Sequence, residues 1–115
     1  MKSVTNLSSS NNPNSGSLYS LQKGKIPPQA VDLEEIVLGA MMIDKKGVDE
    51  VIDILHSDVF YKDTHKAIFE AIISLFEKQE PIDLKTVSYQ LKKDSKLSFI
   101  GGDVYLIGLT QKVSS

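Results

Sequence analysis

Apolar residues recur at helical spacing along most of the chain, and the pattern is clearest after Asp63. There they fall at i, i+3, i+4, i+7 and i+8, which predicts one buried helical stripe made of Ile68, Ala71, Ile72, Leu75 and Phe76. Phe69 and Ile73 lie off this stripe, so the helix is expected to have neighbours on more than one side. Asp63 is a candidate N-cap, and Lys78 lies where the helix dipole favours a cation. We interpret this segment as the central helix of a small bundle.

The same periodicity predicts two helices before the central one. The first carries a stripe of Leu33, Ile36, Val37, Ala40 and Met41, with Leu38 and Met42 beside it. Gly39 interrupts this helix at a cost of about 1 kcal/mol, which suggests the close approach of a neighbouring helix. A turn at 44–47 then leads to a short helix that ends near His56, with apolar residues at Val48, Val51, Ile52 and Leu55. Phe60 is the expected inward anchor of the following connection.

Two further helices are expected after the Pro81 corner. Asp83 is a candidate N-cap for a helix whose apolar residues are Leu84, Val87 and Leu91. A short apolar link follows, formed by Leu97, Phe99 and Ile100. Gly101-Gly102 then breaks the chain, and Asp103 is the expected N-cap of a last helix with Tyr105, Leu106 and Leu109. No segment alternates as a strand would, so the predicted fold is all-α, a compact bundle of about five short helices.

The chain divides by composition at about residue 26. Residues 1–25 are rich in Ser and Asn and hold too few apolar residues to form a core, so they are predicted to be a disordered tail. Residues 26–115 contain the helical pattern and make a single domain.

Charge and cysteine content narrow the possible functions. Three of the thirteen lysines lie in residues 1–31, whereas all fifteen acidic residues lie in residues 32–115, and arginine is absent. An acidic body without guanidinium groups disfavours direct nucleic-acid binding. The absence of cysteine excludes disulfides, thiol catalysis and thiolate metal sites. With no long apolar run and no signal peptide, no membrane association is expected, and we expect a soluble cytoplasmic protein.

No motif in the chain points to catalysis, a cofactor or a metal. Gly24-Lys25 lacks the flanking residues of a phosphate-binding loop, and Gly101-Gly102 is better explained as a helix-start turn. His56 and His65 do not have the spacing of a metal site. His65 is expected in the first turn of the central helix, where it makes a local hydrogen bond or packs under the preceding loop. Glu34-Glu35 are expected on a solvated face.

Four blocks, in this order, carry a family resemblance. IPPQAVDLEEIVLGAMMID at 26–44, DVFYKDTHKAIFEAI at 58–72, PIDLKTV at 81–87 and GGDVYLIGL at 101–109 together resemble the N-terminal domain of DnaB-family hexameric replicative DNA helicases. The resemblance implies a helical head domain of a bacterial replisome that serves ring assembly and the docking of primase or a helicase loader. The helical hairpin and the ATPase domain of the family are absent, so ATP and Mg²⁺ are expected only in that missing domain, and this fragment is expected to be no enzyme.

Association of such heads requires apolar side chains that no intramolecular neighbour covers. The candidates are the off-stripe residues Leu38, Met42 and Phe69, together with Tyr105 and Ile107 near the C-terminus. Tyr105 is the preferred partner contact, because it has a ring to bury and a hydroxyl to keep hydrated. A core tyrosine is the alternative.

Two other classes remain open on the sequence alone. One is a small helical DNA-binding module in which the Pro81 corner is the turn of a helix-turn-helix, and its binding would weaken with rising salt. The other is the helicase-binding region of a primase, although the IPPQ and PIDLKTV blocks favour the helicase.

Overall fold

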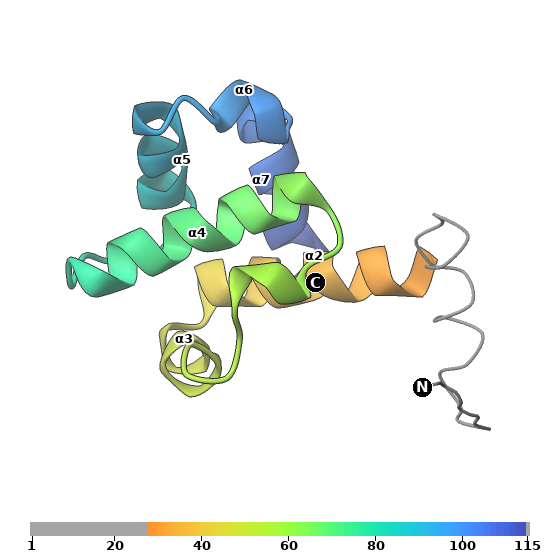
Figure 1. The fold of residues 1–115 in the computed structure, drawn as a ribbon, viewed down its shortest axis with the longest axis horizontal. Coiled ribbons are helices and arrows are strands. Elements are labelled where there is room, and N and C mark those ends of the chain that lie inside the picture. Colours follow the sequence, from red (N-terminus) through yellow and green to blue (C-terminus); the bar gives the residue numbers. More distant parts are fainter. Residues whose placement is uncertain (1–27, 115) are drawn as a thin grey trace, which may run out of the picture. The chain divides into compact units, whose positions relative to one another are not determined.

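The computed structural model describes residues 28–114, and these form six α-helices and a short 3₁₀ turn with no strand (Figure 1). The helices are α2 (Pro28–Ile43), α3 (Lys45–Val51), α4 (Asp63–Glu77), α5 (Leu84–Lys93), α6 (Leu97–Ile100) and α7 (Gly102–Val113), and the turn η1 spans Ser57–Val59. The predicted all-α class is confirmed. One more helix is present than expected, because the apolar link at 97–100 is itself helical. The predicted disordered tail lies outside the described residues.

The chain divides into two units, Met1–Val31 and Asp32–Ser115. Of the first unit the structure describes only residues 28–31, which are helical. The second unit holds the rest of α2 and all of the other elements, and the sites below belong to it.

Helix α4 is the centre of the second unit, as its apolar pattern predicts. Ile68, Ala71, Ile72 and Leu75 are buried, and the helix packs against η1, α5 and α6. Phe76, the last member of the stripe, is 36 % exposed at the end of the helix. The connection before α4 is anchored by Phe60, which is buried with its ring centroid 5.1 Å from that of Phe69.

The predicted buried face of α2 is correct only in part: Met41 is buried and Val37 packs against the core, but Leu33 and Ile36 are exposed. Its inward side carries Glu34, Leu38, Met41 and Met42, whereas Leu33, Ile36 and Ile43 are exposed. Helix α2 is apolar around most of its circumference, so the 3.6-residue period does not decide which side faces the core. The close approach expected at Gly39 is confirmed, because a Cβ atom there would overlap the carbonyl oxygen of Leu109 on α7.

Two predicted helix starts differ from the structure. Helix α3 begins at Lys45, inside the predicted turn, because the Asp44 side chain accepts a hydrogen bond from the backbone N–H of Lys46 at 3.0 Å. It also ends at Val51, before the predicted end near His56. Helix α4 includes Asp63 in its first turn instead of being capped by it.

The starts of α5 and α7 contrast with each other. Asp83 caps α5 as predicted, in a reciprocal capping box with Thr86 in which both hydrogen bonds are 2.9 Å. The prediction that Asp103 caps α7 is wrong. Helix α7 begins at Gly102, after Gly101 in a left-handed conformation, and Asp103 accepts a 2.5 Å hydrogen bond from the hydroxyl of Ser88 on α5.

Candidate functional site

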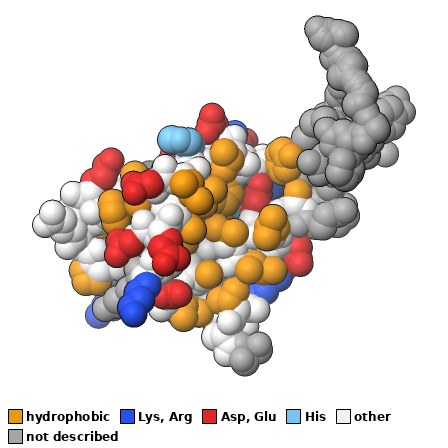
Figure 2. Space-filling view, turned by 90° about the horizontal axis from the view of Figure 1, so that it is seen from below, with side chains coloured by type: hydrophobic (Ala, Val, Ile, Leu, Met, Phe, Trp, Pro, Cys, Tyr) orange, Lys and Arg blue, Asp and Glu red, His pale blue; other side chains and the backbone are white. Residues whose placement is uncertain are grey.

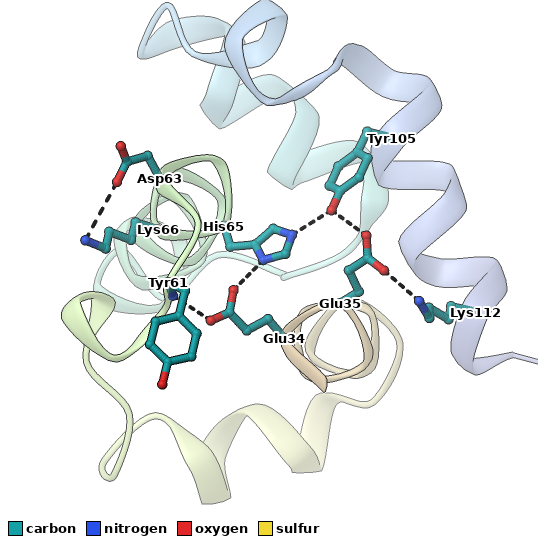
Figure 3. Close-up of polar contacts among 8 residues, drawn as sticks. All are labelled: Glu34, Glu35, Tyr61, Asp63, His65, Lys66, Tyr105 and Lys112. Atoms are coloured by element: carbon teal, nitrogen blue, oxygen red, sulfur yellow. Dashed lines mark hydrogen bonds and ion pairs between the residues drawn. The ribbon is translucent and has the colours of Figure 1, made fainter. Parts of the chain in front are cut away.

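A buried polar network joins α2, α4 and α7 at His65 (Figure 3). His65 lies in the first turn of α4 and is fully buried. Its Nδ1 is 2.6 Å from Oε1 of Glu34, and its Nε2 is 2.6 Å from the hydroxyl of Tyr105. Glu34 also accepts a 2.5 Å hydrogen bond from the backbone N–H of Tyr61. The network thus holds three helices and the loop before α4 at one point.

The network continues from Tyr105 towards the surface. The Tyr105 hydroxyl donates to Oε2 of Glu35 at 2.8 Å, and Lys112 Nζ donates to Oε1 of the same carboxylate at 2.6 Å. Lys112 also pairs with Asp32. Burial, followed by the hydrogen bond with Glu35, raises the pKa of Tyr105 far above its ordinary range. Burial alone would raise the pKa of Glu35, but its hydrogen bonds with Lys112 and Tyr105 outweigh that effect and lower it.

The number of available protons decides which atom donates and which accepts in each hydrogen bond of the network. A hydroxyl has one proton, and Tyr105 donates it to Glu35, so its oxygen accepts a hydrogen bond from Nε2 of His65. The Glu34 carboxylate is an acceptor towards Nδ1. All of these bonds form together when both ring nitrogens of His65 carry a proton and both carboxylates are ionised.

Two predictions about these residues are corrected. The hydrogen bonds of His65 are not local, since its partners lie 31 and 40 residues away in the sequence. Glu34 and Glu35 do not share a solvated face, because Glu34 is buried. A signal was present in the sequence: Glu34, Leu38 and Met41 are spaced as one helical face, but the apolar residues of α2 satisfy other faces equally well.

The arrangement links three helices through buried hydrogen bonds. Histidine, tyrosine and carboxylate are the groups of acid–base catalysis. The network residues do not line the hollow between α5 and α7 or the groove beside the α4–α5 corner, both described below. Within the described part of the chain, no three His, Cys, Asp or Glu side chains are placed to hold a metal ion. None of the helices in residues 28–114 is long and apolar enough to cross a membrane.

Three of the five predicted partner contacts lie in the core. Leu38, Met42 and Phe69 are at most 4 % exposed and belong to the hydrophobic cluster around α4. The expectation that no intramolecular neighbour covers them is therefore wrong. A residue that lies off one stripe of a helix is still buried when other helices pack against that side.

The other two predicted contacts lie on α7. Tyr105 is half-buried, with its ring stacked at 6.0 Å from that of His65 and its hydroxyl in the network. Ile107 is 40 % exposed and lines a surface hollow of about 520 Å³ between α5 and α7, together with Leu84. Beside it, Val104 is 81 % exposed. An apolar area therefore lies on the outer side of α7.

A second exposed apolar area lies on α2, and two of its residues, Leu33 and Ile36, were predicted to be buried. Leu33, Ile36 and Ile43 are 61 %, 39 % and 48 % exposed. Their spacings of three and seven residues place them on one side of the helix, and we call them the α2 stripe. Figure 2 views the molecule from the side on which α2 and α3 lie in Figure 1, and it shows hydrophobic side chains gathered among acidic ones.

The helical unit belongs to a known class of replication domains. The family model of the DnaB-like helicase N terminal domain matches residues 26–115, and the chain belongs to this family. Among curated proteins, the chain is similar to the replicative DNA helicase DnaB of Rhodothermus marinus, with 43 % identity over 94 residues, or 82 % of this chain and 10 % of that protein. The corresponding helicase of Geobacillus stearothermophilus is 37 % identical over 77 % of this chain and 20 % of its own length. The chain thus spans about a tenth to a fifth of these relatives.

A solved structure supports the same relationship. The crystal structure of the N-terminal domain of DnaB helicase from Mycobacterium tuberculosis is similar with a TM-score of 0.72 and 35 % sequence identity. The similarity covers 77 % of this chain and 62 % of that chain.

Proposed function

We propose that this chain is the non-catalytic N-terminal head domain of a bacterial hexameric replicative DNA helicase. It serves association of subunits in the ring and docking of primase or a helicase loader in the cytoplasmic replisome. ATP and Mg²⁺ would be bound by a separate ATPase domain. The observation that carries the proposal is the α2 stripe, a row of large apolar side chains left exposed by a helix that is otherwise locked into the fold.

The α2 stripe supports the association role on energetic grounds. Full burial of a Leu or Ile side chain is worth about 1.5–3 kcal/mol, and half of the surface of these residues is still exposed. Each residue of the stripe therefore offers about 1 kcal/mol to a subunit that covers it. The network around His65 fixes the rotation of α2, so the stripe is presented without a cost of reorganisation.

Ring association is tested with a double substitution, Leu33→Gln and Ile43→Gln, in a helicase that carries this domain. Loss of about 2 kcal/mol of contact energy weakens association about 30-fold, measured by sedimentation equilibrium of subunits. The matched control is Ile54→Gln, since Ile54 is 71 % exposed and lies outside the stripe. An equal loss in the control, or unchanged association in the double variant, contradicts the role of the stripe.

The apolar area on α7 supports a docking role. Ile107, Leu84 and Val104 expose apolar surface next to the hollow between α5 and α7, while the Tyr105 hydroxyl is already engaged inside the fold. We call the surface formed by Leu84, Val104 and Ile107 the Ile107 area. We expect a partner to contact this area and to reach only the edge of the Tyr105 ring.

Docking is tested by NMR titration of the isotope-labelled chain with the C-terminal region of the cognate primase. Amide shifts are expected around Leu84, Val104 and Ile107, and Ile107→Ser is expected to weaken binding. Tyr89→Ser is the control, because Tyr89 is 67 % exposed on α5 and does not line the hollow. No shifts at high micromolar primase would reject docking by this head alone.

A further inference from the structure

A second hollow shares no lining residue with the hollow between α5 and α7. It is a surface groove of about 590 Å³ between α3 and the corner that joins α4 to α5. Val48 and Asp49 line it from α3, Phe76 and Glu77 from the end of α4, and Glu80 and Ile82 from the corner. The α2 stripe does not contribute to it either, so neither surface of the proposed function accounts for this groove.

The floor of the groove is apolar. Val48 is buried, Phe76 is 36 % exposed, and Ile82 is half-buried against the core. These side chains leave room for an apolar group that would complete their packing. The groove therefore offers an anchor position for a hydrophobic side chain.

The backbone around the groove is held in place without a ligand. At the end of α4, the N–H of Gln79 bonds to the carbonyl of Phe76 at 3.0 Å, and the N–H of Glu80 bonds to that of Leu75 at 2.9 Å. The capping box at Asp83 fixes the other side of the corner. Because the walls are already ordered, binding costs little conformational entropy on the side of this protein.

The rim determines the chemistry of the occupant. Asp49, Glu77 and Glu80 line the groove, and no lysine whose side chain the structure describes lines it. The ion pairs among the described residues involve none of these three carboxylates. The three are not arranged as a metal site within the described part of the chain, and they repel a phosphate backbone. A cationic side chain next to an apolar anchor complements both the rim and the floor.

We infer that this groove binds a short protein segment in which an apolar residue is flanked by lysine or arginine. The apolar residue packs on Phe76 and Ile82, and the flanking cations lie against Asp49, Glu77 and Glu80. Charge complementarity at the rim selects this segment over an acidic one and speeds its encounter with the groove.

The test is an NMR titration of the isotope-labelled full chain with three synthetic peptides of equal length. The first has central leucines flanked by arginines, the second has the same leucines flanked by glutamates, and the third has serines in place of the leucines of the first. The first peptide is expected to shift the amides of 48–49 and 76–82 and to bind more tightly than the other two.

Variants of the rim give the matched comparison. Glu77→Gln with Glu80→Gln is expected to weaken the first peptide about three- to tenfold, as for the loss of two exposed charge pairs. Glu70→Gln, an exposed position on α4 outside the groove, is expected to leave the affinity unchanged. Backbone amide spectra of each variant establish that it is folded.

Three results overturn the inference: no binding of the first peptide at millimolar concentration, equal binding of the acidic peptide, or shifts confined to the α2 stripe or the Ile107 area. These outcomes are independent of the primase titration, because that experiment monitors Leu84, Val104 and Ile107. Failure of one surface therefore leaves the other proposal standing.

Discussion

Replacing Tyr105 by phenylalanine removes a single oxygen atom from the centre of the buried network. The ring stays in place against His65, but Nε2 of His65 loses its acceptor, and this nitrogen belongs to a fully buried side chain. Leaving a buried donor unsatisfied costs about 1–3 kcal/mol. Glu35 loses one partner but keeps its hydrogen bond from Lys112, so its loss is smaller. We expect Tyr105→Phe to lower the free energy of unfolding by about 2 kcal/mol.

That loss is a large part of the total free energy of unfolding, which is about 5–10 kcal/mol for a domain of this size. Urea unfolding followed by circular dichroism measures it, and thermal unfolding is expected to show a fall of about 4–8 °C for each kcal/mol. Tyr89→Phe is the control, because Tyr89 is exposed and makes no such bond in the described part of the chain, and it is expected to change stability by less than about 0.5 kcal/mol.

A double-mutant cycle separates the hydrogen bond from loss of packing. In a His65→Leu background the donor is already gone, so adding Tyr105→Phe is expected to cost less than about 0.5 kcal/mol. If Tyr105→Phe costs the same in both backgrounds, or is as mild as Tyr89→Phe, then the hydroxyl does not satisfy His65 and the proton count given above is wrong.

Three further predictions follow from particular contacts. Gly39→Ala forces a Cβ atom into the backbone of α7 and is expected to destabilise the fold by about 1–3 kcal/mol in chemical unfolding, whereas Gly108→Ala, with open space around it, is expected to be neutral or stabilising by up to about 1 kcal/mol. The pKa of Glu35 is lower in the folded state than its ordinary value of 4.5, so its contribution to stability is present above that pH and is lost as the pH falls. Glu35→Gln is expected to remove this part of the acid dependence of stability, measured by urea unfolding at a series of pH values. Asp83→Ala removes the capping box of α5 and is expected to cost about 1 kcal/mol, while Asp53→Ala, at an exposed position without a cap, should be silent.

The features that the sequence predicts correctly are local ones. Asp83 and Thr86 are three residues apart, so their capping box can be read directly from the chain. The stripe of α4 is also local, because its apolar residues repeat over more than two turns and the opposite side carries polar ones such as Lys66, Glu70 and Glu77. Gly39 was informative for a different reason. A glycine inside a helix lowers the stability of the helix, and its presence is explained when a neighbouring helix packs too closely to leave room for a Cβ atom.

The features that the sequence analysis missed depend on partners far along the chain. His65 selects Glu34 and Tyr105 at separations of 31 and 40 residues, and no periodicity encodes that choice. The boundary between core and surface on α2 could not be predicted for the same reason. A helix that is apolar on most sides is oriented by its neighbours, and here one of those neighbours is polar.

The buried network and the α2 stripe are two results of a single rotation of α2. A hydrophobic optimum for this helix alone would turn Leu33 and Ile36 inward, where the sequence analysis placed them. Glu34 prevents this, because its carboxylate accepts hydrogen bonds from His65 and from the backbone of Tyr61, and turning it to solvent would leave both donors without their partner. Leaving the buried His65 side chain without its carboxylate partner costs more than leaving a few apolar side chains half-exposed. The polar core of this domain thereby determines which apolar residues of α2 remain exposed.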